Sequence, residues 1–179
     1  MAGGREFNWA KFKELVLLLA ERSAADQLMS RVKMNKLLYR IDFESYRLLG
    51  HSMTGATYIK GEHGPMAAEL PVAEEELGRS GYLDWRIKEA GPYEQKVPVA
   101  KEDADAGQFS KAELSIIDAA LAELAGMGGR GASKWSHETS VGWRVMASGE
   151  AIPYETALIS ADPLNDSALA ALRTLDTEP

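Results

Sequence analysis

The sequence predicts an α+β fold: a mainly α-helical single domain with a small antiparallel β-sheet or hairpin. Apolar residues recur at helical spacing in several segments, which predicts amphipathic helices. Two short alternating segments on either side of a Gly-Pro turn predict a hairpin. With 179 residues, the chain is long enough to bury one sizeable core. We expect residues 1–160 to form this domain and residues 161–179 to form a C-terminal helical extension.

Two helices are predicted in the first fifty residues. The first covers residues 9–22, with Asn8 as its N-cap. The second covers residues 31–49, with Ser30 as its N-cap and Gly50 as its C-terminal stop. Because the second helix is apolar on two flanks, we expect it at the centre of the fold.

A short strand is predicted next, over residues 55–60. Gly64 and Pro65 then predict a turn, with the proline at the first position of a following helix. Pro71 predicts a break in that helix, because proline lacks an amide hydrogen and its ring clashes with the preceding turn. The helix is expected to resume over residues 72–78.

The second half of the chain predicts a hairpin and further helices. Residues 83–88 and 93–99 alternate in polarity, as the strands of an antiparallel hairpin do. Ser110 opens a capping box that starts a helix ending at Gly126. Shorter helical pieces follow, and then a last helix that begins at the Asp-Pro pair 162–163.

The composition excludes several classes of function. Cysteine is absent, which removes disulfides, thiol nucleophiles and zinc ribbons. The formal net charge of −7 argues against nucleic acid as a partner and favours a basic protein. No apolar run is long enough to span a bilayer, and the first residues do not resemble a signal peptide. We therefore expect a cytoplasmic protein without a membrane partner.

Three patterns resemble catalytic or ligand-binding motifs only by their letters. Residues 126–131 spell G-x-G-x-x-G, but they follow a predicted helix rather than a strand, so we interpret them as a helix end and a connection. Residues 30–33 spell S-x-x-K without the companion motifs of acyl-transfer enzymes. His51, His63 and His137 lie in separate segments without metal-ligand spacing. We predict no catalytic, metal-binding or cofactor-binding residues.

Charged residues cluster twice along the chain. Lys33, Lys36, Arg40 and Arg47 form a basic stripe on the second helix, which we interpret as a solvated face. The alternative is a contact strip for an acidic partner or for internal carboxylates such as Asp42.

The second cluster is acidic and comprises Glu69, Glu74, Glu75 and Glu76 around the predicted break. It predicts either a solubilising surface or a seat for a basic partner. Trp85 and Tyr93 on the hairpin are the aromatic residues that we expect to be exposed. Glu74 to Glu76, Trp85 and Tyr93 are thus our candidate partner contacts.

One series of motifs resembles a known family. It consists of a K-x-x-K-L-L-Y helix, a T-G-x-x-Y strand entry, a G-P-x-x-x-E-L turn and an H-E ending before a tryptophan. The residues that carry the match are Lys33, Lys36, Leu37, Leu38, Tyr39, Asp42, Thr54, Gly55, Tyr58, Gly64, Pro65, Glu69, Leu70, His137 and Trp143. In this order and spacing they resemble the Panacea domain, the SocA-like antitoxin family. The resemblance extends to about Tyr154.

The resemblance implies a non-enzymatic antitoxin that neutralises a cognate toxin protein by direct binding. One branch of the family instead resembles a proteolytic adaptor that delivers its toxin to a Clp protease. In both cases the motif residues are expected to hold a shared scaffold, while more variable surfaces contact the toxin.

Two other classes of function stay open from the residues. A helix followed by the 83–99 hairpin resembles a winged helix, which predicts a DNA-binding regulator, although the glutamates near that helix would repel phosphate. An enzyme would need at least two of the three histidines, with carboxylates, in one pocket.

Overall fold

The computed structural model describes residues 6–90 and 92–160. The fold is α+β and mainly helical, as predicted. Its elements are α1 (Trp9–Arg22), α2 (Arg31–Leu49), β1 (Tyr58–Gly61), β2 (Gly64–Ala67), α3 (Leu70–Arg79), β3 (Leu83–Ala90), β4 (Tyr93–Ala100), the 3-10 turn η1 (Ala106–Gln108), α4 (Lys111–Glu123), α5 (Gly129–Thr139), α6 (Val141–Val145) and the 3-10 turn η2 (Tyr154–Leu158).

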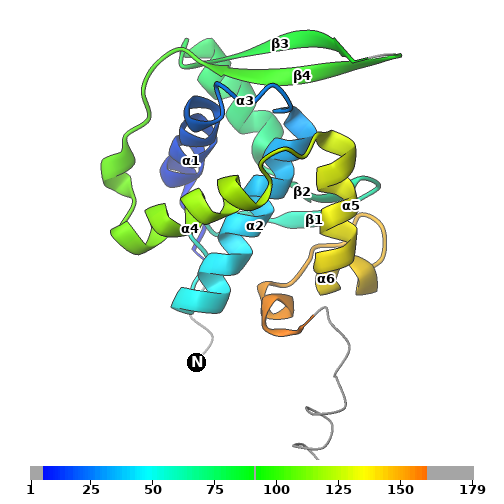
Figure 1. Cartoon of the computed structure of the whole chain (residues 1–179). Helices are drawn as coiled ribbons and strands as arrows, with labels where there is room; N and C mark the ends of the chain where they lie inside the picture. Colours follow the sequence, from blue (N-terminus) through cyan, green and yellow to red (C-terminus); the bar gives the residue numbers. More distant parts are fainter. Residues whose placement is uncertain (1–5, 91, 161–179) are drawn as a thin grey trace, which may run out of the picture.

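The helix α2 is the central element of the fold. It contacts α1, α4, α5, η2, β2 and β4 (Figure 1). Its apolar residues Met34, Leu37 and Leu38 are completely buried, together with Leu15 and Leu19 of α1. The prediction that α2 lies at the centre is therefore confirmed, and its two apolar flanks are explained by neighbours on several sides.

Local capping groups set the ends of the main helices as the sequence predicts. The Asn8 side chain accepts a hydrogen bond from the backbone N–H of Lys11 at the start of α1. The Ser30 side chain caps α2, and Gly50 ends it in the left-handed conformation with φ of 79°. Ser110 forms the predicted capping box at the start of α4. Each of these groups satisfies backbone donors or acceptors that a helix end leaves free.

Two antiparallel hairpins complete the fold. In the first, β1 pairs with β2, so that Tyr58 lies opposite Ala67. Residues 149–152 add a short segment beside β1: the N–H of Ile152 donates to the carbonyl of Tyr58 at 2.7 Å. In the second, β3 pairs with β4 from Leu83 opposite Ala100 to the tip, and this hairpin lies across one end of the helices (Figure 1).

The region around the two early prolines differs from the prediction. Pro65 lies in β2 rather than at the start of a helix. The helix α3 begins at Leu70, and Pro71 lies in its first turn, where the missing amide hydrogen costs nothing because that group has no intrahelical partner. No break occurs, and the predicted strand over 55–60 is β1, displaced to Tyr58–Gly61.

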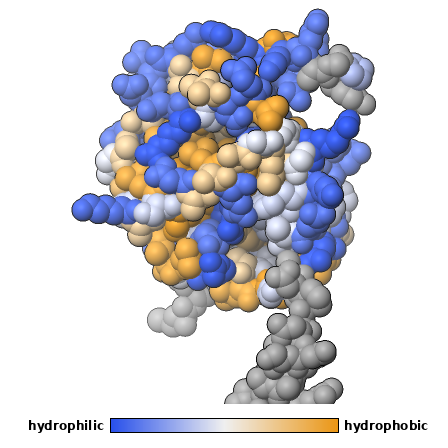
Figure 2. All heavy atoms as spheres, viewed as in Figure 1, coloured by the Kyte–Doolittle hydropathy of each residue, from blue (hydrophilic) through white to orange (hydrophobic). Residues whose placement is uncertain are grey.

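The predicted last helix, with its start at residues 162–163, lies outside the described residues. Within the described part of the chain, no helix has the length and apolar content needed to cross a membrane. Figure 2 shows that the visible face of the molecule mixes charged and apolar surface. Among the exposed large apolar residues are Leu48 and Leu49 at the end of α2 and Ile87 on β3.

Candidate functional site

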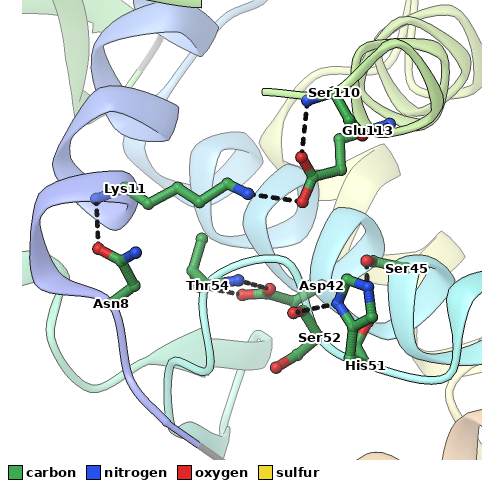
Figure 3. A network of polar contacts seen from close by, with 9 residues as sticks. All are labelled: Asn8, Lys11, Asp42, Ser45, His51, Ser52, Thr54, Ser110 and Glu113. Carbon is green, nitrogen blue, oxygen red and sulfur yellow. Dashed lines mark hydrogen bonds and ion pairs between the residues drawn. The ribbon is translucent and has the colours of Figure 1, made fainter. Parts of the chain in front are cut away.

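A buried carboxylate, Asp42, connects α2 to the chain that leads into β1. It is completely buried. One oxygen accepts from the backbone N–H of Thr54 at 2.7 Å, and the other accepts from the hydroxyls of Thr54 at 2.5 Å and Tyr58 at 2.7 Å. Figure 3 shows the carboxylate facing Thr54. Three charge-assisted hydrogen bonds therefore fix the strand entry on the central helix.

The protonation of this network follows from its burial. Burial raises the pKa of Asp42, and the hydrogen bonds from Thr54 and Tyr58 oppose that shift. Burial also raises the pKa of Tyr58 well above its usual value, and the charge of Asp42 acts in the same direction. Tyr58 therefore stays protonated and donates a hydrogen bond to the Asp42 carboxylate, as a structural hydroxyl does.

Two further polar side chains of α2 bind the backbone of β2. The Asn35 side-chain oxygen accepts from the N–H of Ala67 at 2.9 Å. The Lys36 amine donates to the carbonyl of Pro65 at 3.1 Å and is almost completely buried. Because burial disfavours the charged amine, the pKa of Lys36 is lowered to about 8. These contacts join the central helix to the small sheet.

Glycine is required at two motif positions because other chain segments approach closely. Gly55 has φ of 76°, and a Cβ there would lie 2.6 Å from the carbonyl oxygen of Glu6. Gly64 has φ of 105°, and a Cβ there would lie 2.3 Å from Ser136 Oγ and 2.7 Å from Lys36 Cε. A larger residue at either position would combine an unfavourable backbone conformation with a collision.

The motif residues near the end of the matched region pack on β1. Trp143 donates from its indole nitrogen to the carbonyl of Gly61 at 2.9 Å. The ring of His137 stacks on that of Trp143 with 3.8 Å between centroids, and the Lys60 amine lies 4.8 Å from the Trp143 ring centroid. Burial, followed by the charge of Lys36, lowers the pKa of His137. A neutral imidazole is thus favoured in this stack.

The basic stripe on α2 is not the solvated face that the sequence predicts. Lys33 and Lys36 are buried, and the Lys33 amine pairs with Asp26 at 2.6 Å. Only Arg40 and Arg47 reach the outside, where both bind Glu44. The interpretation failed because both buried amines find their partners on other elements, which helical periodicity does not reveal.

The acidic cluster is engaged by groups of the same chain. Glu74 pairs with Arg31 at 2.6 Å. Glu76 accepts from the Lys13 amine and from the Trp9 indole, each at 3.0 Å. The Glu69 carboxylate accepts from the backbone N–H of Thr57 at 3.0 Å, and Glu75 forms an exposed pair with Arg79 on α3.

Of the two aromatic residues predicted to be exposed, the structure shows the side chain of only Trp85. Trp85 is half-buried against the core, and its indole N–H has no hydrogen-bond partner among the described residues. The side chain of Tyr93 lies outside the part that the structure describes. The remaining motif residues Leu37, Leu38 and Leu70 are buried in the core.

The histidines do not form a ligand set. Across residues 6–90 and 92–160, no group of three or more histidines and carboxylates is placed to hold a metal ion. His51 hydrogen-bonds the neighbouring carbonyl of Ser52, and His63 is exposed in the turn between β1 and β2. Of the three, only His137 takes part in the packing described above.

Three further polar residues in this region, Asn35, Ser136 and Ser140, were not predicted from the sequence. The Tyr39 hydroxyl lies 2.6 Å from the Ser140 hydroxyl, which also caps α6. Asn35 binds β2, and Ser136 faces Gly64. A serine directly before a short helical piece is a cap signal that would have identified Ser140, whereas Asn35 and Ser136 carry no such signal.

Comparisons with known proteins give the family. A search of the curated proteins and a search of the solved structures each found no match. The family model described as antitoxin SocA-like, Panacea domain, matches residues 34–144, which is more than half of the chain and extends from α2 to α6. The chain therefore belongs to the SocA-like antitoxin family that carries the Panacea domain.

Proposed function

We propose that this protein is an antitoxin that neutralises a toxic protein by binding it directly. The observation that supports this function is the match of the Panacea domain over residues 34–144. The partner is the cognate toxin. The antitoxin binds the toxin and covers the surface through which the toxin acts, so it needs no catalytic step. We expect the pair to act in the cytoplasm.

We also propose that the family motif forms a scaffold rather than the toxin contact. Asp42, Lys36 and Tyr58 are buried, and their polar atoms bind other groups of the same chain. Gly55 and Gly64 lie where the backbone or a neighbouring side chain leaves no room for a Cβ. Groups that are engaged in this way are not available to a partner, so the toxin must be recognised by other residues.

The β3–β4 hairpin is the surface that we propose for toxin binding. Arg86, Lys88 and Lys96 form no ion pair with any described carboxylate, and the Ile87 side chain is 64% exposed. A cleft of about 520 Å³ lies between this hairpin and the end of α1. The Lys88 amine donates to the carbonyl of Gln27 at 3.0 Å, which leaves its charge without a carboxylate partner. Cations without an ion pair around exposed apolar surface suit a toxin face that carries carboxylates.

The earlier candidate contacts border this hairpin. Trp85 lies on β3, and Glu75 lies on α3, which packs against β3. Glu74 and Glu76 bind cations on other helices, whereas Glu75 pairs only with Arg79 of its own helix, and both of these side chains are exposed. Because an exposed i,i+4 pair costs little to break, we propose that Glu75 is the member of the acidic cluster that meets the toxin. Tyr93 belongs to the same hairpin and is included in the proposed surface.

Co-expression tests the function. The product of the neighbouring gene should stop growth when it is expressed alone and be harmless with this protein, and the two should co-purify in a fixed ratio. Loss of the toxin from cells with intact Clp protease, and its recovery without Clp, would favour the adaptor function over blockade. A neighbour that is harmless alone, together with salt-dependent binding of this protein to DNA, would favour the regulator.

Charge reversal tests the surface. The variant Arg86→Glu with Lys96→Glu should lose the co-purified toxin, whereas Lys134→Glu, an exposed reversal on α5, should retain it. If both variants retain the toxin equally, the hairpin is not the contact, although the antitoxin function itself would still stand.

A further inference from the structure

The hydrogen-bond pattern of the β3–β4 hairpin shows which backbone groups each strand leaves free. The N–H of Lys101 donates to the carbonyl of Tyr82 at 2.8 Å, so these two residues form a hydrogen-bonded pair at the base of the ladder. Hydrogen-bonded and non-hydrogen-bonded pairs alternate along an antiparallel ladder. Along the register, Trp85 and Pro98 therefore form a non-hydrogen-bonded pair, as expected of a residue without an N–H.

Ile87 and Glu89 direct their backbone groups away from β4. By the same alternation, both belong to non-hydrogen-bonded pairs, opposite Lys96 and Glu94. Each of them therefore presents one N–H and one C=O at the outer edge of β3. Neither N–H has a hydrogen-bond partner within residues 6–90 and 92–160. An edge with free donors and acceptors is a template on which another strand can pair.

The rest of the fold covers the hairpin unevenly. The strand β4 packs against α1 and α2, whereas β3 packs against α3, and Figure 1 shows β3 as the outermost strand. The contact with α3 lies at the start of β3, where a Cβ on Gly78 would be 3.7 Å from the carbonyl of Leu83. The N–H of Trp85 is also occupied, because it donates to the Asp84 side chain at 2.8 Å. The free part of the edge therefore begins after Trp85.

The side chains along this free edge specify what kind of strand fits it. Arg86 and Lys88 lie on one side of β3 and Ile87 lies on the other, because side chains alternate along a strand. Neither cation forms an ion pair with a described carboxylate, and Ile87 is largely exposed. Opposite charges directly across a ladder stabilise the pairing of two strands. A segment with the order acidic, apolar, acidic therefore matches the edge.

A second copy of this chain does not match the edge. A symmetric antiparallel pairing of two β3 strands has its centre at Arg86, Ile87 or Lys88. The first sets Arg86 opposite Arg86, the second sets Arg86 opposite Lys88, and the third sets Lys88 opposite Lys88. Each places a cation directly across from a cation, which destabilises the pairing. Charges on an edge strand guard against self-association in this way, and they also select a partner of opposite charge.

We propose that the toxin supplies an extended segment with the order acidic, apolar, acidic, which pairs with β3 and adds a strand to the hairpin. The N–H and C=O groups of Ile87 and Glu89 bind its backbone. Arg86 and Lys88 bind its carboxylates, and the Ile87 side chain packs against its apolar residue. Backbone pairing supplies affinity and the alternating side chains supply specificity. This inference rests on the proposed antitoxin function and adds the way in which the toxin is held.

Amide hydrogen exchange tests the pairing, first in the free protein and then in the complex with the purified, co-expressed toxin. In the free protein, the amides of Arg86 and Lys88 should exchange slowly because they bond to β4, whereas those of Ile87 and Glu89 should exchange fast. The toxin should slow exchange at Ile87 and Glu89 by about tenfold or more and leave Glu94 unchanged. Slow exchange at Ile87 and Glu89 already in the free protein, or no change there in the complex, would overturn the proposal.

Two proline variants provide a matched comparison of the two edges. Glu89 and Glu94 lie directly opposite each other, so Glu89→Pro removes an outward N–H from β3 and Glu94→Pro removes one from β4. Both leave the bonds between β3 and β4 in place. Glu89→Pro should raise the Kd for the toxin by about tenfold or more, whereas Glu94→Pro should leave it unchanged. Urea unfolding of both variants shows whether they are equally stable.

The outcomes separate this inference from the function on which it rests. If the natural protein binds the toxin and the two proline variants bind it equally well, the edge pairing is wrong and the antitoxin function stands. If the natural protein binds no toxin, the function fails and the inference fails with it.

A zero-length carbodiimide cross-link tests the chemistry of the paired segment. Lys88 should be joined to an acidic residue of the toxin that lies two positions from another acidic residue. Lys88→Arg, which keeps the charge but cannot form the amide bond, should remove this product, and the exposed Lys134 on α5 should give none. A cross-link from Lys88 to a segment without this pattern would contradict the proposed order of residues.

Discussion

The two hairpins of this protein differ in how their polar groups are bonded. At β1–β2, side chains from α2 reach the strand backbone, and the indole of Trp143 binds the carbonyl of Gly61. At β3–β4, Arg86 and Lys96 form no ion pair within the described chain, and the Trp85 indole N–H is buried without a partner there. The first region is joined to α2 by several buried hydrogen bonds, whereas the second packs Leu83 and Trp85 against the core and donates one exposed hydrogen bond, from the Lys88 amine to the carbonyl of Gln27.

This difference separates what holds the fold from what is free to recognise a partner. Buried polar groups with complete hydrogen bonding fix one arrangement, and changing one of them leaves its partners unsatisfied. Exposed cations without partners cost little to change. Substitutions in the first hairpin should therefore reduce stability, and substitutions in the second should alter binding.

The largest effect is expected at Asp42. Asp42→Ala removes the acceptor of three buried donors, on Thr54 and Tyr58, and should lower the free energy of unfolding by about 3 to 5 kcal/mol. Urea unfolding at pH 7 measures this. Glu75→Ala, which breaks only an exposed i,i+4 pair, should change stability by less than about 0.5 kcal/mol. Equal losses in the two variants would contradict the structural role of the network.

Alanine substitutions at two glycines should separate the cost of a steric collision from the cost of an unfavourable backbone conformation. Gly64→Ala places a Cβ 2.3 Å from Ser136 Oγ at a φ of 105° and should cost about 3 kcal/mol. Gly149→Ala has a φ of 82° but nothing within 4 Å of the new Cβ, so it should cost about 1 kcal/mol. Thermal and urea unfolding of both variants give the comparison. If the Gly64→Ala protein is as stable as the Gly149→Ala protein, β2 shifts to relieve the collision at little cost in free energy.

Lys36 should make stability depend on pH. Its pKa is about 8 in the folded protein, against 10.5 for an ordinary lysine. Between these values the unfolded chain binds more protons, so the contribution of Lys36 to the free energy of unfolding rises with pH, by up to about 3 kcal/mol. Tyr39, whose folded pKa is raised to about 12, acts in the opposite direction above its ordinary pKa of 10.0, which leaves pH 8 to 10 as the informative window.

Unfolding of the natural protein and of Lys36→Met across this window isolates the contribution of Lys36. The difference between the two free energies should increase steadily from pH 8 to pH 10. The exposed substitution Lys134→Met should follow the natural protein at every pH. A flat difference for Lys36→Met would mean that the pKa of Lys36 in the folded protein is close to that of an ordinary lysine, so that the amine stays charged across this window.

Local chemistry explains which parts of this fold the sequence predicts. The caps Asn8, Ser30 and Ser110 act on donors within three residues, so their effect is visible in a short window of sequence. The sequence alone does not decide which element holds Pro65 and which holds Pro71, because a proline suits an edge strand and a first helical turn equally well. The hydrogen bonds of Asn35 and Lys36 with the backbone of β2 favour the strand at Pro65.

The candidate site shows the same limit. Motif spacing identified the family, and Asp42 with Tyr58 proved to be in contact although they lie sixteen residues apart. The burial of Lys33 and Lys36 was missed, because their partners, Asp26 and the carbonyl of Pro65, lie outside the helix. A helical pattern gives the direction of a side chain around its own axis and does not show what another element places there.

The smallest effect on stability is expected at Ile87. Leu83 and Ile87 lie on the same side of β3, four residues apart, but Leu83 is 2% exposed and Ile87 is 64% exposed. Leu83→Asp should cost more than about 3 kcal/mol, and Ile87→Asp less than about 0.5 kcal/mol. If Ile87→Asp leaves unfolding unchanged and still weakens toxin co-purification, the exposed end of the strand serves recognition. If it destabilises the fold as Leu83→Asp does, the hairpin belongs to the scaffold, and the contrast between the two hairpins fails.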